Sequence, residues 1–281
     1  RDAARMMSEK LHAYGWEYIN IDDGWEAPER TKGGEILSND KFPDFKALTD
    51  YIHGLGLKFG IYSSPGATTC GGHVGSYQHE EIDARTWERW GVDYLKYDYC
   101  GYLDIEKDSK EETIQEPYIV MRNALDKVKR DIVFCVGYGA PNVWNWAAEA
   151  GGNQWRTTRD ITDEWNVVTA IGTFQDVCAD ATAPGRNNDP DMLVVGKLGQ
   201  GWGSKVHDSY LTADEQYSHI SLWCILSAPL LIGCDMANMD DFTLNLLTNN
   251  EVIAVSQDPM VAPARKMLVK NGQIWSKKLY D

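Results

Sequence analysis

Short apolar runs alternate with helical patterns along most of this chain. Apolar and β-branched residues predict strands at residues 18–21, 58–62, 94–97, 132–136, 153–156, 192–195 and 230–233. Segments with apolar residues at every third or fourth position predict helices at residues 45–53, 80–90, 113–129, 163–174, 214–226 and 241–248. Strands that alternate with helices in this way indicate parallel β/α units.

The two ends of the chain differ from this alternation. Residues 3–14 already form an amphipathic helical pattern, and residues 273–279 predict a strand after the last helix. A (β/α)₈ barrel has eight strands, so a helix that comes first implies a strand before it. We therefore expect an α/β fold, a TIM-type (β/α)₈ barrel that covers residues 1–262 and lacks its first strand. Residues 263–281 are then expected to begin a C-terminal antiparallel β domain.

Composition narrows the possible partners. The chain has 281 residues, 43% of them hydrophobic, and a formal net charge of −15. Such a charge repels phosphate backbones and anionic membranes, so we expect neither nucleic acid nor a lipid surface as a partner. No apolar run approaches the roughly 20 residues that a membrane span needs.

Polar side chains follow the ends of several predicted strands. Alternation along residues 94–100 places Lys96, Asp98 and Cys100 on one face, which is a poor core face. A lone Lys-x-Asp is more often an exposed ion pair, but acids also follow other strands; they are Asp22, Asp23, Asp160, Asp189, Asp191 and Asp235. The carboxyl ends of barrel strands meet at one mouth, where functional residues gather. For Asp189 and Asp235 helix capping remains the better interpretation.

The sequence lacks the motifs of other common catalytic chemistries. The six histidines form no HxH or HExxH set, and there is no GxSxG, GxxxxGK[ST] or CxxC motif. We therefore expect no metal and no cofactor. Paired carboxylates with additional groups that could bind sugar hydroxyls fit glycoside hydrolysis.

Several motifs together resemble glycoside hydrolase family 27, the α-galactosidases and α-N-acetylgalactosaminidases. In chain order they are YINIDDGW, KFGIYSSPGATTCGG, WGVDYLKYDYC, NQWRTTRDITDEW, NDPDMLVVG, SAPLLIGCDM and EVIAVSQDP. The resemblance implies that Asp98 is the nucleophile and Asp160 the general acid/base of a retaining enzyme. Lys96 would favour the charged form of Asp98. Asp160 would need desolvation or a nearby negative charge to hold its proton.

The resemblance also implies a sugar-binding set. Asp22 and Asp23 would bind O4 and O6, Lys96 the ring hydroxyls, and Arg156 the region near O2. Tyr62 would line the pocket, and Gly137 and Tyr138, which follow the predicted strand at residues 132–136, would belong to the same substrate-binding set. Cys70 and Cys100 would form a disulfide beside the site. This implies an oxidising, extracytoplasmic compartment, with any signal peptide outside this chain.

Gly137 departs from the family pattern, which often has an acid or amide there, near O2 of the sugar. The glycine removes a contact to O2, makes room for a larger C2 substituent, or merely permits a tight turn. Trp202, in the loop at residues 197–211, either lines an outer subsite or packs as an ordinary surface side chain.

The predicted function is retaining exo-hydrolysis of terminal α-galactose from oligosaccharides or polysaccharide side chains. The same machinery could serve an α-N-acetylgalactosaminidase or a β-L-arabinopyranosidase. Because Asp22 and Asp23 are both present, as they are in galactosidases, the β-L-arabinopyranosidase function is less favoured. A catalytically inert carbohydrate-binding protein is the alternative of another class, and the presence of both Asp98 and Asp160 argues against it.

Overall fold

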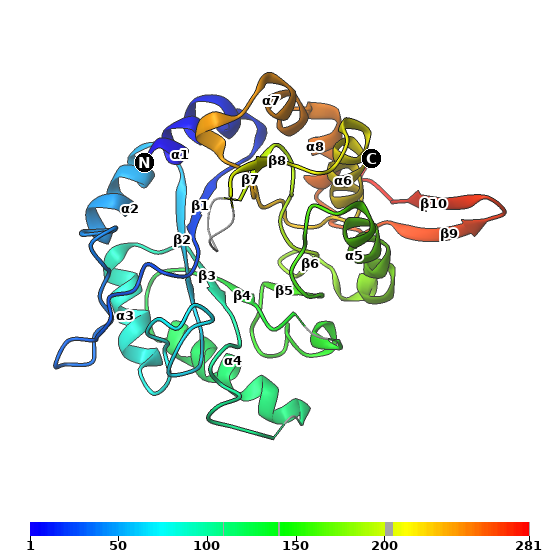
Figure 1. Ribbon diagram of the computed structural model, residues 1–281. Coiled ribbons are helices and arrows are strands. Elements are labelled where there is room, and N and C mark those ends of the chain that lie inside the picture. The colour runs from blue at the N-terminus through cyan, green and yellow to red at the C-terminus, as the bar shows by residue number, and fades with distance from the viewer. Residues whose placement is uncertain (109, 140, 200–204, 281) are drawn as a thin grey trace. The chain divides into compact units, whose positions relative to one another are not determined.

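The structure is a computed structural model, which describes residues 1–108, 110–139, 141–199 and 205–280 (Figure 1). Trp202 lies outside the described residues. Two compact units make up the chain. The first consists of Arg1–His12, Trp16–Tyr138 and Trp146–Trp155, and the second of Ala13–Gly15, Gly139–Asn145 and Arg156–Asp281.

A parallel sheet forms the centre of the first unit. The first five of its six strands are β1 (Tyr18–Ile21), β2 (Lys58–Ser63), β3 (Tyr94–Tyr97), β4 (Val133–Val136) and β5 (Gln154–Arg156), and the sixth is β6 (Asn187–Asp189). Each of the first four pairs in parallel with the next along the chain. The register places Tyr62 opposite Lys96 and Ser63 opposite Tyr97. Parallel pairing brings the carboxyl ends of these strands to the same edge, so the polar residues that follow them become neighbours.

The main helices of the first unit lie along the outer side of these strands (Figure 1). They are α2 (Phe45–Gly54), α3 (Glu80–Trp90) and α4 (Glu111–Leu125). Asp44 caps α2 by accepting the amide of Ala47, and Gly91, with φ of 85°, ends α3. The expected helix at residues 3–14 is divided into α1 (Asp2–Met6), η1 (Met7–Leu11) and η2 (His12–Tyr14).

The second unit is mainly helical. Its longer helices are α5 (Trp165–Cys178), α6 (Ala213–Ile225), α7 (Asp241–Leu247) and α8 (Asn250–Ser256). Shorter elements are η3 (Val143–Asn145), η4 (Ala179–Ala181), η5 (Met236–Asn238), β6 (Asn187–Asp189), and the paired strands β7 (Lys197–Leu198) and β8 (His207–Asp208). A capping box between Thr212 and Glu215 begins α6. No helix within the described ranges is long and apolar enough to cross a bilayer.

Two of the seven strand predictions were wrong. The strand expected at residues 192–195 lies earlier, at β6, because Pro190 and a left-handed Asp191, with φ of 80°, turn the backbone before Met192. Residues 192–195 and 230–233 form an isolated parallel bridge, between Leu193 and Ile232, instead of two strands.

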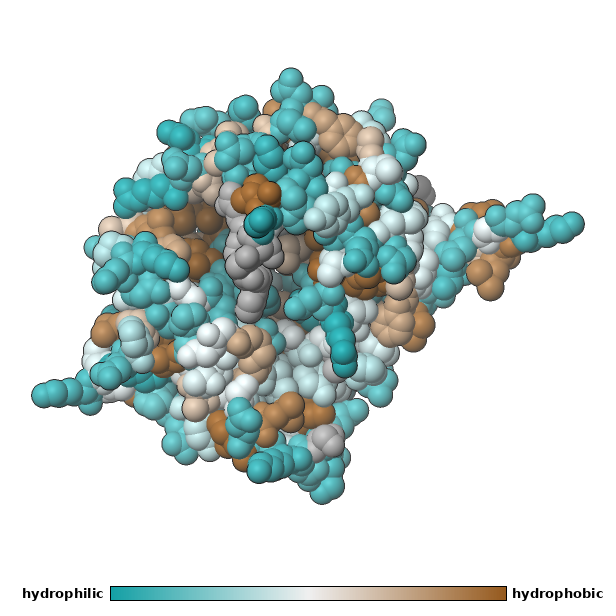
Figure 2. All heavy atoms as spheres, viewed as in Figure 1, coloured by the Kyte–Doolittle hydropathy of each residue, from teal (hydrophilic) through white to brown (hydrophobic). Residues whose placement is uncertain are grey.

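An exposed antiparallel hairpin lies near the end of the chain. It consists of β9 (Arg265–Val269) and β10 (Gly272–Ser276), which confirms most of the strand predicted at residues 273–279. Asp176 of α5 accepts the amide of Lys266 over 2.9 Å, which anchors the start of the hairpin. Farther along, apolar side chains face solvent (Figure 2), and Leu268 is 78% exposed.

Candidate active site

Lys96 and Asp22 form an ion pair at the carboxyl ends of β3 and β1. The Lys96 ammonium donates to Asp22 Oδ2 over 2.8 Å, and Asp22 Oδ1 accepts the amide of Asp23, also over 2.8 Å. The same ammonium lies 5.2 Å from the centre of the Tyr62 ring, within range of a cation–π interaction. Lys96 is therefore fixed between a carboxylate and an aromatic face, in a polar environment that is open to solvent.

Asp23 is held by two backbone donors. Its Oδ1 accepts the amide of Gly24 over 2.8 Å, and its Oδ2 accepts the amide of Gly71 over 2.6 Å. A Cβ atom added to Gly71 would lie 2.9 Å from Asp23 Oδ2, so only glycine lets the backbone approach the carboxylate this closely without displacement. Both Asp22 and Asp23 thus present oriented oxygens at this edge of the sheet.

Asp98, directly after β3, has both carboxylate oxygens oriented by the protein. Its Oδ2 accepts the Tyr62 hydroxyl over 3.1 Å, and its Oδ1 accepts the amide of Tyr99 over 2.8 Å. The Asp98 amide donates to Ser63 O over 2.9 Å, and its carbonyl accepts the Tyr118 hydroxyl over 3.0 Å. Burial is the main cause that raises the pKa of Tyr62 above its usual range, and the negative charge of Asp98 is the second cause. The Tyr62 phenol therefore remains protonated and donates to the carboxylate.

A disulfide joins Cys70 and Cys100 beside this carboxylate, as the resemblance implied. The Tyr62 hydroxyl lies 3.1 Å from Cys70 Sγ, so the disulfide and Asp98 share a neighbour. One oxygen of Asp98 and the two sulfurs lie within 4.8 Å of one another, a spacing that could suggest a metal site. The sulfurs are bonded to each other and supply no thiolate, so the disulfide explains this cluster. The other four cysteines, all within the described ranges, are buried and form no disulfide.

Gly137 packs directly on the backbone that carries Asp98. Its amide donates to Tyr97 O over 2.7 Å, and an added Cβ atom would lie 2.9 Å from Asp98 Cα. Gly137 does not have a positive φ. The glycine is therefore required by the close approach of the backbone and not by a left-handed turn. The next residue, Tyr138, contacts the edge of the Tyr99 ring, with 4.9 Å between the ring centres.

The second unit contains a group of charged residues centred on Arg156. The guanidinium donates to Asp160 Oδ1 over 3.1 Å and lies 2.8 Å from Asp191 Oδ2. The side chains of Arg156 and Asp191 are 7% and 8% exposed, whereas that of Asp160 is 94% exposed. Burial lowers the pKa of Arg156, but the charges of Asp191, then Asp189, then Asp160 raise that pKa above its usual range. Arg156 is therefore a permanent cation that links a buried acid to an exposed one.

Asp191 is the site residue to which sequence reasoning assigned no role. Its Oδ2 also accepts the amide of Ile161 over 2.9 Å, which ties it to the segment of Asp160. The signal was an Asp-Pro-Asp sequence near a predicted strand. Of the two acids interpreted as helix caps, Asp235 does cap η5. Asp189 instead accepts the amide of Asp191, in the turn after β6.

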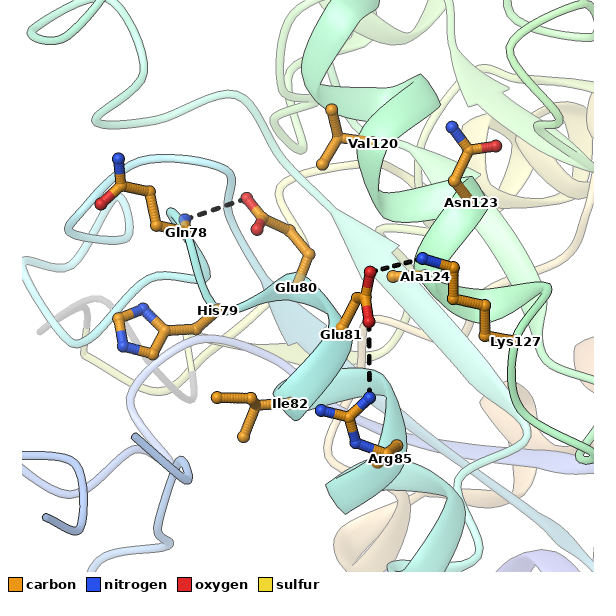
Figure 3. A pocket seen from close by; sticks show the side chains of 10 residues that line it. All are labelled: Gln78, His79, Glu80, Glu81, Ile82, Arg85, Val120, Asn123, Ala124 and Lys127. Carbon is orange, nitrogen blue, oxygen red and sulfur yellow. Dashed lines mark hydrogen bonds and ion pairs between the residues drawn. The ribbon is translucent and has the colours of Figure 1, made fainter. Parts of the chain in front are cut away.

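A cleft on the outer surface of the first unit has no part in either group. It has a volume of about 520 Å³ and is lined by residues of α3 and the turn before it, and of α4 and the turn after it (Figure 3). Among its charged groups, Glu81 forms ion pairs with Arg85 and Lys127, and Glu80 accepts the amide of Gln78 (Figure 3). None of the predicted site residues lines this cleft.

Comparison with known proteins relates nearly the whole chain to one family. The family described as alpha galactosidase A (Melibiase_2) matches residues 1–258. The chain is 42% identical to an alpha-galactosidase of Cyamopsis tetragonoloba over 99% of this chain and 64% of that protein. The chain thus spans a little less than two thirds of this relative.

Solved structures agree with this comparison. Alpha-galactosidase I from Mortierella vinacea aligns with a TM-score of 0.89 at 33% identity, over 99% of this chain and 73% of that chain. The alpha-galactosidase of Saccharomyces cerevisiae, solved with raffinose, aligns with a TM-score of 0.85 at 26% identity, over 99% of this chain and 66% of that chain.

Proposed function

This chain belongs to the alpha galactosidase A family (Melibiase_2), and on that premise we propose that the whole protein is a retaining exo-α-galactosidase. The observation that carries the proposal is the arrangement of Asp98. Its two oxygens are held by the Tyr62 hydroxyl and the Tyr99 amide, next to the polar group of Asp22, Asp23 and Lys96. A fixed carboxylate among hydroxyl-binding groups suits attack on a sugar carbon.

Galactose recognition is assigned to Asp22, Asp23 and Lys96. The carboxylates of Asp22 and Asp23 are oriented by backbone amides, and each oxygen has more than one lone pair, so both acids can still accept sugar hydroxyls. They would bind O4 and O6, and the ammonium of Lys96 would donate to a ring hydroxyl. Because these groups are already oriented, little side-chain entropy is lost when the sugar binds.

The reaction is a double displacement on the anomeric carbon. Asp98 attacks that carbon while the bond to the leaving oxygen breaks, and Asp160 gives its proton to that oxygen. The product of this step is a covalent galactosyl ester of Asp98. Asp160, now a carboxylate, takes a proton from water, which attacks the same carbon and releases galactose and free Asp98. Two inversions give net retention.

Arg156 has a positioning role in this proposal. It donates to Asp160 and is itself locked by the buried Asp191, so it sets the orientation of the general acid/base. The side chain of Asp160 is 94% exposed, and its surroundings therefore supply little of the desolvation expected for a general acid. We assign that desolvation to the bound substrate, which would exclude water from Asp160.

The fold of the whole protein is proposed from the same relatives. The parallel β/α units over residues 1–262 would belong to a (β/α)₈ barrel, and residues 263–281 would begin a C-terminal antiparallel β domain. Leu268, 78% exposed on β9, supports this, because further strands would cover such a side chain. The Cys70–Cys100 disulfide supports an extracytoplasmic location.

The substrate is proposed to be an oligosaccharide or side chain that ends in α-galactose, in keeping with the raffinose bound to the yeast relative. An α-N-acetylgalactosaminide is less favoured, because the backbone of Asp98 already fills the space next to Gly137 Cα. A β-L-arabinopyranoside lacks the hydroxymethyl group that the pair of Asp22 and Asp23 would bind. An inert binding protein would not need the oriented carboxylate of Asp98.

Hydrolysis of aryl glycosides by the full-length protein tests the proposal. The panel contains the α-galactoside, the α-N-acetylgalactosaminide and the β-L-arabinopyranoside. Asp98→Asn serves as the inactive variant and Asp104→Asn, at an exposed position, as the matched control. We expect dominant α-galactoside turnover that Asp98→Asn abolishes and Asp104→Asn preserves. Wild-type turnover by Asp98→Asn would overturn the assignment of the nucleophile, and no turnover on the panel would overturn the function.

A further inference from the structure

An exposed tyrosine is attached to the segment that carries Asp160. Tyr210, which lies just after β8, is 73% exposed, and its amide donates to Asp163 Oδ2 over 2.8 Å. Asp163 follows Asp160 by three residues, a span of at most about 10 Å even when fully extended. The Tyr210 backbone is therefore anchored to the segment that carries the proposed general acid/base, while its ring stays exposed to solvent.

His207 supports the Tyr210 ring. The two rings are stacked, with 4.6 Å between their centres and an angle of 25° between their planes. His207 Nε2 lies 3.2 Å from the same Asp163 oxygen, and Nδ1 donates to Lys205 O over 2.9 Å. Asp163 is thus the common anchor of both aromatic residues.

The backbone between the two rings is also anchored. The Ser209 amide donates to Gly196 O over 2.7 Å, and the Ser209 hydroxyl donates to Val194 O over 2.8 Å. These bonds hold the segment between the rings at both backbone and side chain. An exposed aromatic ring whose support is ordered in advance loses little entropy when a ligand covers it.

We propose that Tyr210, stacked on His207, forms a binding subsite for the leaving-group sugar, the second pyranose of the substrate. The inference rests on the proposed function, because a general acid must contact the oxygen of the leaving group. The leaving sugar therefore lies on the Asp160 side of the scissile bond. A pyranose offers a flat face of C–H groups, which suits the face of a tyrosine ring.

The experiment compares two substrates that share the galactosyl group and differ in the leaving group. Melibiose has a leaving sugar, whereas α-galactosyl fluoride has none. The full-length wild type is compared with Tyr210→Ala, with Tyr210→Phe, which keeps the ring, and with Tyr217→Ala, a control at another exposed tyrosine. The quantity measured is kcat/KM for each substrate.

We expect Tyr210→Ala to lower kcat/KM for melibiose about 3- to 10-fold, the range of an aromatic contact, and to leave that for the fluoride unchanged. Tyr210→Phe and Tyr217→Ala should match the wild type on both substrates. Equal loss on both substrates, or no loss on melibiose, would overturn the subsite. If the wild type hydrolysed neither substrate, the proposed function itself would fail, which separates the two outcomes.

Discussion

The hydroxyl of Tyr62 donates a hydrogen bond to Oδ2 of Asp98 over 3.1 Å. Tyr62 is buried at the end of β2, and its ring also faces the ammonium of Lys96. One tyrosine thus contacts both the proposed nucleophile and a proposed sugar ligand. Its hydroxyl and its ring can be tested separately.

Tyr62→Phe should lower kcat/KM for an aryl α-galactoside about 10- to 100-fold, because a hydrogen bond to a charged group contributes roughly 1.5–3 kcal/mol. The ring remains, so the melting temperature should change little. Tyr51→Phe is the control, because Tyr51 lies on α2 and its ring contacts Arg1. A Tyr62→Phe enzyme with the wild-type rate would show that the phenol does not orient Asp98.

Arg156→Lys should destabilise the protein and slow the reaction. A lysine cannot donate to Asp160 and Asp191 with the planar geometry of a guanidinium, and Asp191 would stay buried with a poorer partner. We expect a loss of about 2–3 kcal/mol in the free energy of unfolding, measured by urea denaturation, and a lower kcat. The exposed Arg159 provides the control Arg159→Lys. Identical urea midpoints for the Arg156 and Arg159 variants would contradict this role.

Glu26 should make stability depend on pH. It is 2% exposed, and burial raises its pKa to about 8. The folded state therefore keeps a proton that the unfolded state releases near its ordinary pKa, so stability should fall as pH rises from about 5 to about 8. The linked free energy has an upper bound of about 5 kcal/mol.

Melting temperatures at pH 5 and pH 8 test this dependence. Glu26→Gln should remove much of the fall between the two values, whereas Glu29→Gln, at an exposed position, should retain it. If Glu26→Gln and the wild type lost the same stability over this window, Glu26 would not be the group that titrates.

Gly137→Ala should lower kcat on every substrate, by about tenfold or more, because the added Cβ would press on the backbone of Asp98. The ratio of rates on α-galactoside and α-N-acetylgalactosaminide should stay the same. Gly54→Ala is the control, because a Cβ there meets no atom within 4 Å. A change in that ratio without a general loss would indicate that Gly137 sets specificity at C2.

The strand and helix patterns predicted the elements whose burial follows a simple period. β1, β3 and α3 have the bounds expected from sequence, because their apolar positions face one core. β6 was misplaced because its end depends on a left-handed Asp191, which is held by contacts with Arg156 and Ile161. Such contacts join residues about 30 positions apart, and no local pattern reveals them.

The sequence proposes the members of the candidate site, but it does not predict the contacts between them. Alternation along β3 placed Lys96 and Asp98 on one face, yet the pairing of Lys96 with Asp22 depends on how β1, β2 and β3 align. The amide of Gly71 reaches Asp23 only because the loop after β2 folds back over β1. These contacts require the tertiary structure, and sequence periodicity does not contain them.

Trapping of the covalent intermediate tests the central claim most directly. The full-length protein would be incubated with 5-fluoro-α-galactosyl fluoride, digested, and its labelled peptide identified by mass spectrometry. We predict a single sugar ester on Asp98, in the peptide that contains YLKYDYC, and no label in Asp98→Asn. A label on another carboxylate, or steady turnover with inversion and no trapped ester, would contradict the account.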